Sequence, residues 1–552
     1  MSLFVDIFGF LSVVLRGLIL SAQSFMLGGL AFMTLLLAPL APRLSADATR
    51  VGPRSRRLIR VSALCFSAFV ACSLTLNAAT LVAAAGESWM EALGADFARA
   101  DFALIAAALL IALLCGGAWS PARAAALAAL GAATLASQTM LTHAASRADP
   151  SPALLVADPL HMLGAAVWIG GLPYLLVALQ ECRKGTDWRL VGRRYSLMAM
   201  ASVAAIVLSG VVMAVAYVGS PEAFYGTAYG VMIATKIVIL LMLLALGGAN
   251  YLLVERLRRD PSTPILRLRR FAEVEIGLGL AAIAAAASVT SLPPSVDLTQ
   301  DRLAFSEIVE RYAPRPPRLT SPDHDALTIS QLQRRLDAEA ARGEATSAPR
   351  AFVPGESPPL PRNAADVAWS EYNHHWAGVF VLVIGVLAMV ERFPSGRWAR
   401  HWPLLFVLMA AFLFVRADEQ AWPLGPIGFF ESMRDPEVAQ HRVVIALVAL
   451  FGLYEWRVRA RGADGGEAAL FFPLATAAAS VMLLAHSHSI GNVKEELLIE
   501  LSHTPMALLG LVAAFARWLE LRLEGRAARI AGWIWPVCFA LIGLVLLDYR
   551  EA

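Results

Sequence analysis

The sequence predicts an all-α protein that crosses a membrane many times. Of its 552 residues, 58% are hydrophobic and 16% are charged, and the mean hydropathy is +0.61. Soluble proteins carry about a quarter charged residues. Many apolar runs reach the length of 18 or more residues that a membrane-spanning helix needs. These observations together predict a polytopic helical membrane protein that contacts membrane lipid.

Composition also argues against several classes of protein. No basic stripe suggests a nucleic-acid partner, and the net charge of +3 is close to neutral. The five cysteines are scattered in or beside apolar runs without a CxxC pair, which argues against a disulfide framework or a zinc ribbon. The start, MSLFVDIFGF, has no basic segment and no small-residue cleavage site, so we expect a first span rather than a cleaved signal.

Apolar runs predict about fourteen spans, in a set of eight followed by a set of six. The first set is 7–37, 61–85, 102–119, 124–143, 154–180, 197–218, 229–253 and 271–292. The second set is 375–391, 402–416, 441–456, 468–486, 503–521 and 530–547. We therefore predict an eight-helix N-terminal domain (1–292), a linker rich in Pro, Arg and Asp (293–374), and a six-helix C-terminal domain (375–552).

The placement of Lys and Arg predicts the orientation of these spans. Most basic residues of the short loops fall in one alternating set of loops, such as 43–60, 181–196 and 255–270. The positive-inside rule puts that set in the cytoplasm. Both termini, the linker and the loop before residue 503 are then expected on the outer side.

Histidines gather at the outer face of this topology. Eight of the ten are predicted at outer ends of spans: His143, His161, His374, His375, His441, His486, His488 and His503. Interfacial anchoring residues would populate both faces. Neutral imidazole is a ligand for copper, zinc, iron and nickel, so this one-sided distribution predicts metal or cofactor binding.

The C-terminal set comprises His375, His441, His486, His488 and His503. His486 and His488 are two apart and cannot share one face of a regular helix, so we expect a helix break near them. Glu500 precedes His503 by three residues and is expected to orient its ring. The alternative is a polar loop whose histidines form interfacial hydrogen bonds.

The N-terminal set combines thioethers with imidazoles: Met140, His143, His161 and Met162. This soft combination favours Cu(I). Asp158 precedes His161 by three residues and is expected to orient its ring, and it is also a candidate partner for Lys236. The methionines are equally explained as core packing, and an Asp158–Lys236 pair as a structural ion pair.

Polar and small residues nearer the inner side have simpler interpretations. Glu273 and Glu275 are expected to pair with neighbouring arginines. Trp168 is expected to fill space, while Gly170 and Gly171 allow close helix packing.

These motifs resemble the copper resistance protein D (CopD) family of bacterial inner-membrane proteins. The resemblance rests on THA, DPLHMLGAAVWIGGLPYLL, RYSLMAMASVAAIVLSGVVM and YGVMIATKIVILLMLLALGGANYLL, and it covers about 138–294. The C-terminal QHR, HSHSIGNVKEELL and ELSHTP resemble the extension of longer members. The resemblance implies a multi-pass inner-membrane protein that takes periplasmic copper from a chaperone and passes it to the cytoplasm. It points to His143 and His161, and to His441, His486, His488 and His503.

The expected function is therefore copper capture and transport rather than enzyme catalysis. The linker is too polar to hold a copper-binding β-domain, so a periplasmic chaperone would be a separate protein. Two alternatives stay open at this point. One is a redox protein, in which outer histidines ligate haem b or copper. The other is a sensor or assembly factor that binds copper without moving it.

Overall fold

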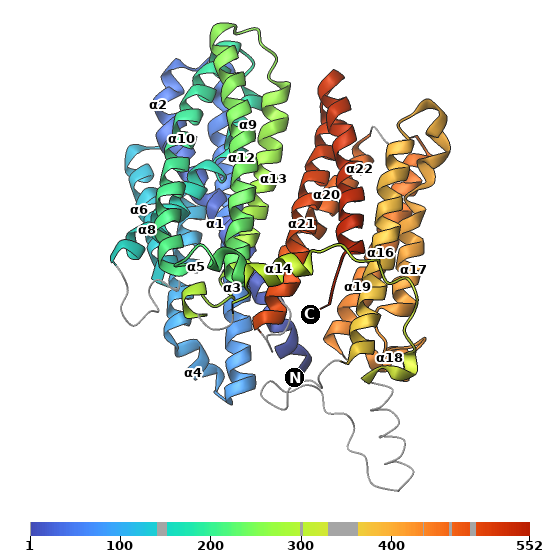
Figure 1. Cartoon of the computed structure of the whole chain (residues 1–552). Helices are drawn as coiled ribbons and strands as arrows, with labels where there is room; N and C mark the ends of the chain where they lie inside the picture. The colour runs from blue at the N-terminus through green and yellow to red at the C-terminus, as the bar shows by residue number, and fades with distance from the viewer. Residues whose placement is uncertain are drawn as a thin grey trace. The chain divides into compact units, whose positions relative to one another are not determined.

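The computed structural model describes residues 2–140, 152–298, 302–328, 363–433, 435–462, 466–485 and 493–551. These residues form two compact units, Phe10–Arg302 and Leu303–Ala552, the second together with Met1–Gly9. Both units consist of α-helices and short turns (Figure 1). Within the described ranges, extended pairing is limited to an isolated bridge between Ala421 and Ile427. The all-α expectation is therefore confirmed.

The first unit is a bundle of long helices joined by short connections. Its elements are α1 (Ser2–Ala31), a π-helical turn (Phe32–Leu37), α2 (Ala38–Leu40), α3 (Val51–Ala85), α4 (Trp89–Gly94), α5 (Asp96–Leu114), α6 (Pro121–Met140), α8 (Pro152–Trp168), α9 (Leu172–Glu181), α10 (Gly185–Tyr217), α11 (Ala223–Gly226), α12 (Ala228–Arg259) and α13 (Leu266–Val289). The most extensive packing joins α8 to α10, α12 to α13 and α3 to α5.

Glycines set how closely α1 approaches α8 in this unit. A Cβ at Gly170 would lie 1.9 Å from the Ser24 oxygen, and one at Gly28 would lie 2.3 Å from the Ala166 oxygen. Real Cβ atoms do not approach main-chain atoms this closely, so only glycine permits the observed contact. Close helix packing at Gly170 is thus confirmed.

The second unit is a separate helical bundle. Its elements are α14 (Phe305–Arg311), α16 (Ala364–Val390), a 3₁₀ segment (Pro394–His401), α17 (Leu404–Arg416), α18 (Phe429–Ser432), α19 (Pro436–Ala460), α20 (Phe471–Ala485), α21 (Val493–Arg522) and α22 (Gly525–Leu547). Helix α22 packs against both α16 and α21. Gly378 and Gly385 let α22 approach α16, since a Cβ at Gly385 would lie 2.5 Å from the Ala540 nitrogen.

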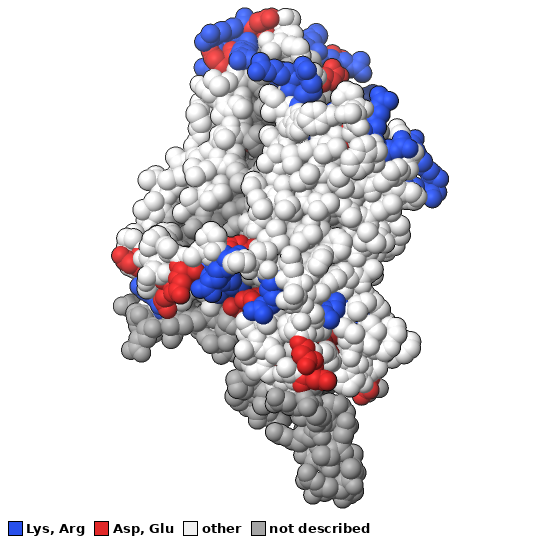
Figure 2. Space-filling model, turned by 45° about the vertical axis from the view of Figure 1, so that its right-hand side comes forward, with Lys and Arg blue, Asp and Glu red and all other residues white. Residues whose placement is uncertain are grey.

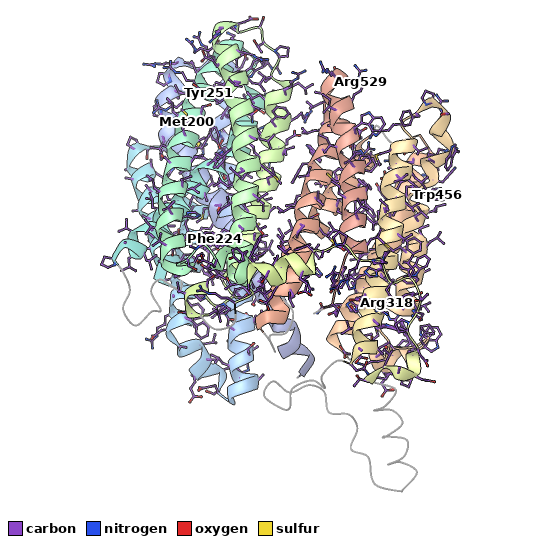
Figure 3. The ribbon with its side chains drawn as sticks, in the orientation of Figure 1. Met200, Phe224, Tyr251, Arg318, Trp456 and Arg529 are labelled. Carbon is purple, nitrogen blue, oxygen red and sulfur yellow. The ribbon has the colours of Figure 1, made fainter. Side chains whose placement is uncertain are left out.

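The described part of the predicted linker packs on the two units rather than extending into solvent. On the first unit, Ser295 and Thr227 share a hydrogen bond of 2.7 Å between their hydroxyls. On the second unit, the Arg318 main-chain N–H donates to His375 Nδ1 at 2.7 Å, and Figure 3 labels Arg318 beside α16. The boundary between the units falls inside this segment, between Arg302 and Leu303.

Twelve stretches of the described chain are long and apolar enough to cross a membrane. They coincide with twelve of the predicted spans, and α8 with α9 makes one of them. The other two predicted spans correspond to α6 and α19, which lie outside this set, so the number fourteen stays a prediction. Figure 2 shows charged side chains near the ends of the helices and a broad uncharged belt between them. The orientation of the chain also stays a prediction.

Several helices begin well before the predicted spans. Helix α16 begins at Ala364, after an Asn363 cap that accepts from the Asp366 N–H at 3.0 Å. Helix α21 begins at Val493, ten residues before the predicted start. His375 and His503, both predicted at helix starts, therefore lie inside helices.

Candidate functional site

His161 occupies a defined position between α8 and α10 in the first unit. Its Nδ1 lies 3.1 Å from Ser209 Oγ, and this hydroxyl donates its own hydrogen to the Ala205 carbonyl at 2.6 Å. Ser209 therefore accepts from His161 Nδ1–H, which leaves the lone pair on Nε2. The ring packs over Gly210, where a Cβ would lie 3.6 Å from Cε1. A neutral imidazole held in one tautomer is a suitable metal ligand.

Charged side chains surround this histidine. Asp158 is buried, with 8% of its surface exposed, and it attracts both Lys236 of α12 and Arg16 of α1. Lys236 also lies near enough to His161 to interact with it electrostatically. The expected Asp158–Lys236 attraction is therefore present. The partner found at His161 Nδ1, however, is the Ser209 hydroxyl rather than the expected Asp158 carboxylate.

Met162 follows His161 directly on a regular helix. Consecutive helical residues point about 100° apart, so these two side chains leave α8 in different directions. Met140 ends α6, but its side chain lies outside the described residues. His143 also lies outside them. The predicted four-residue thioether and imidazole set therefore stays a prediction.

Glu275 departs from the sequence interpretation. Its neighbour Glu273 pairs with Arg270 at 2.5 Å, as expected. Glu275 itself is 2% exposed and accepts a hydrogen bond from Asn250 Nδ2 at 2.5 Å and another from the Trp168 side chain. The expectation of an arginine partner is wrong for Glu275, because its side chain points into the bundle. Trp168 is likewise a hydrogen-bond donor and not only a filler.

In the second unit, two histidines meet around one tyrosine. The His374 ring of α16 stacks on Tyr549 with centroids 3.7 Å apart, and His503 of α21 meets the same ring edge-on at 6.5 Å. His374 Nδ1 donates to the Ser370 carbonyl at 2.9 Å, so its lone pair is on Nε2. His503 Nδ1 lies 3.1 Å from Ser502 Oγ.

Glu500 was expected to orient the His503 ring. It is buried, and it accepts from Thr504 Oγ1 one turn further along α21 at 3.2 Å. The Ser502 hydroxyl lies next to His503 Nδ1, and the orientation of this ring by Glu500 stays a prediction.

His375 makes a different set of contacts from its neighbour. Its Nδ1 accepts from the Arg318 N–H at 2.7 Å, and its Nε2 donates to the Tyr549 carbonyl at 2.9 Å. Both ring nitrogens are therefore used by main-chain groups, and neither has a lone pair left for a metal in this geometry. His375 therefore connects residues 303–328 to the residues that follow α22.

His441 lies on α19 beside a carboxylate from the preceding loop. Its Nδ1 is 2.6 Å from Asp418 Oδ1. Arg442 donates to the main-chain oxygens of Phe414 at 2.5 Å and Trp422 at 2.8 Å. Asp418 thus has the position of a carboxylate that orients a ligating imidazole.

A cavity of about 230 Å³ opens beside Tyr549, lined among others by Arg311, Tyr312, Ser502 and Asp548. Burial raises the pKa of the Tyr312 phenol, so it stays neutral, and burial lowers the pKa of Arg311. Pockets for cofactor-sized ligands occupy roughly 300–1,000 Å³. This cavity accommodates an ion with water better than a haem, and the haem alternative gains no support.

Two predicted ligands, His486 and His488, lie outside the described residues. Within the described ranges, no group of three or more His, Cys, Asp or Glu side chains is placed to hold a metal ion. His374, His375, His441 and His503 are thus brought to one end of the second unit, but the described residues do not assemble them into a complete site.

The structure adds residues that sequence reasoning missed. His374, rather than His375, offers a ring nitrogen, and Ser209 and Asp418 orient His161 and His441. A signal for His374 exists in the sequence, because Gly378 and Gly385 follow it by four and eleven residues. These spacings place all three on one helical face, which packs on α22.

Comparison with known proteins places part of the first unit in a family. The family model described as Copper resistance protein D matches residues 189–289. Residues 189–289 thus match the model of the CopD family and are called the CopD segment below. The CopD segment covers most of α10 and all of α11, α12 and α13, and it lies inside the stretch 138–294 that carries the sequence resemblance. It contains Ser209, Lys236, Asn250 and Glu275, while His161 precedes it.

A curated relative supports the same assignment. The chain is 30% identical over 155 residues to "Copper transport protein CutJ" of Bacillus subtilis (strain 168), and the alignment covers 27% of each chain. The larger part of both proteins lies outside this alignment. No solved structure matches the chain. The CopD segment and the apolar helices are those of a multi-pass inner-membrane protein.

Proposed function

We propose that the protein binds copper at the periplasmic ends of its helices and moves it through the first unit to the cytoplasm. The observation that carries this proposal is the His161–Ser209 contact, in which a residue of the CopD segment leaves His161 Nε2 able to bind a metal. The relative named as a copper transport protein supports the choice of copper as the transported ion.

The geometry suggests how this site works. His161 binds the ion through Nε2, and Ser209 keeps the ring neutral and oriented. Asp158 and Asp101 compensate the charges of Lys236 and Arg16 nearby, so that a cation can approach without facing two uncompensated positive groups. His143 and Met140 would complete the ligand set from α6 and the residues that follow it. A separate periplasmic chaperone would deliver the ion.

The second unit would collect copper at its own outer end. His374 and His503 meet at Tyr549, and His441 interacts electrostatically with His374. His486 and His488 would complete this set from the segment between α20 and α21. Ligand exchange between such histidines would hand the ion on without a covalent step.

Copper uptake tests the proposal directly. Cells that lack the protein are complemented with wild type, His161→Ala or the control His401→Gln, which changes an exposed histidine next to Trp456 (Figure 3). We expect uptake with wild type and the control and at least a ten-fold loss with His161→Ala. Equal uptake by all three would refute the role of His161.

A metal analysis joined to an absorption spectrum separates the alternatives. Bound copper without a Soret band, lost on His161→Ala, supports copper handling. A Soret band would move the protein to the redox class. Copper binding without uptake in the deletion strain would identify a sensor or assembly factor.

A further inference from the structure

Polar side chains form two clusters in the contact between four helices of the first unit, one at His161 and one at Glu275, and the buried apolar residues Ile239 and Leu243 lie between them on α12. Three of these helices each contribute one residue to the cluster at His161 and another to the cluster at Glu275. They are His161 and Trp168 of α8, Ser209 and Tyr195 of α10, and Lys236 and Asn250 of α12. Lys236 and Asn250 are fourteen residues apart, which is about 21 Å along α12. Figure 3 labels Phe224 toward one end of this region and Tyr251, next to Asn250, toward the other.

Glu275 of α13 lies in the cluster that contains Asn250 and Trp168. Its hydrogen-bond donors, Asn250 and Trp168, are both neutral, and no cationic partner for it occurs among the described residues. The titratable group that faces it is the Tyr195 hydroxyl of α10, which donates to the Trp168 carbonyl.

A second observation concerns the amide of Asn250. Its Oδ1 is buried and accepts no hydrogen bond in the described part of the chain. Rotating the amide by 180° would bring this oxygen to Glu275, where a protonated carboxyl can donate to it and an ionised one cannot. The environment of Glu275 therefore suits a neutral carboxylic acid as well as an ion.

Charge balance connects this carboxyl group to the transported ion. A carboxylate without a counter-ion is unfavourable in the membrane interior, and so is an unpaired cation. The neutral form of the Glu275 carboxyl group is thus favoured while no ion is near it. When a monovalent cation arrives, the ionised form is favoured because it restores neutrality.

We propose that Glu275 exchanges one proton for each copper ion that passes from the His161 cluster to the Glu275 cluster, an inference that rests on the proposed function. The Glu275 O–H bond breaks as Cu(I) moves inward from His161, and the electron pair stays on oxygen. The proton leaves to water on the outer side, the carboxylate balances the ion, and a proton from the cytoplasmic side returns when the ion departs, so one proton moves outward for each copper ion that moves inward. No oxidation or reduction is involved.

The test follows copper and protons together. Full-length protein is reconstituted in liposomes with a pH-sensitive dye, and Cu(I) is supplied outside. We expect wild type to move both ions. Glu275→Gln keeps an acceptor for the Trp168 side chain but cannot release a proton, so copper entry should fall at least ten-fold and the proton signal should vanish. The control Glu273→Gln, beside Arg270, should retain both signals.

The outcomes separate this inference from the proposed function. Copper entry without proton movement in wild type, or a proton signal that persists in Glu275→Gln, overturns the inference and leaves copper transport intact. No copper entry in wild type overturns the proposed function and the exchange with it. Infrared spectroscopy provides a readout without copper: the C=O stretch of a protonated carboxylic acid should be present in wild type and lost in folded Glu275→Gln. If this stretch is absent from wild type, Glu275 is not protonated and the inference is overturned.

Discussion

The end of the second unit opposite to His374 and His503 contains a buried network of charges whose disruption should destabilise the protein. Its members are Glu391, Arg392, Glu455, Arg459, Arg517 and Glu520. Three acids face three bases, so the network is neutral. Glu520 accepts from Arg392 and Arg517 at 2.7 Å each, and from the Trp535 indole at 2.8 Å. Its side chain is 17% exposed, and that of Arg517 is 7% exposed.

The substitution Glu520→Gln keeps the side-chain shape but leaves two guanidiniums facing one fewer charge. Breaking a buried ion pair from one side costs about 3–5 kcal/mol. Residual exposure of Glu520 and the remaining amide oxygen place the expected loss near the low end, about 3 kcal/mol. The free energy of unfolding, measured by denaturant titration of the detergent-solubilised protein, checks this value.

Two further variants make the test specific. Glu310→Gln, in an exposed pair with Arg315, is the matched control and should leave the free energy of unfolding unchanged. Arg392→Gln in the Glu520→Gln background restores neutrality and should recover part of the loss. If Glu520→Gln behaves like Glu310→Gln, the buried network does not stabilise this end, and the reasoning is refuted.

Four other substitutions test the sites and the helix packing. Ser209→Ala removes the group that holds His161 in one tautomer, so copper uptake should fall about ten-fold to a hundred-fold without loss of folding; unchanged uptake would contradict this role. His374→Ala should lower the amount of copper bound per purified protein. His375→Ala should instead lower the melting temperature, because it leaves two main-chain groups without their hydrogen-bond partner. The reverse pattern would make His375 the copper ligand and His374 the structural residue. Gly170→Ala should reduce the yield of folded protein measured by size-exclusion chromatography, since its Cβ would overlap the α1 backbone; a normal yield would show that α1 can shift.

Prediction of the helices succeeded where apolar runs marked them. Each predicted span coincides with a helix, because the cost of exposing polar backbone to lipid forces every long apolar run into helical hydrogen bonding. The ends were less well predicted. Helix α16 begins eleven residues before the apolar run, because its first three turns include polar residues such as Asp366 and Glu371 and are capped by Asn363.

The candidate site was predicted in part. The positions of His161, His441 and His503 near one end of the apolar runs follow from hydropathy alone. Their partners Ser209, Asp418 and Ser502 do not, because two of the three come from other segments. The choice between His374 and His375 depends on helix phase, since adjacent residues point about 100° apart.

The sequence by itself determined the class of the protein, its helical spans and the gathering of histidines at one end of them. Hydropathy and residue type are local properties, and they add up along the chain. Only the tertiary structure decided that Glu275 meets Asn250 and Trp168 instead of an arginine, and that His375 is held by main-chain groups. Such contacts join residues far apart in the chain, and they depend on the packing and rotation of whole helices.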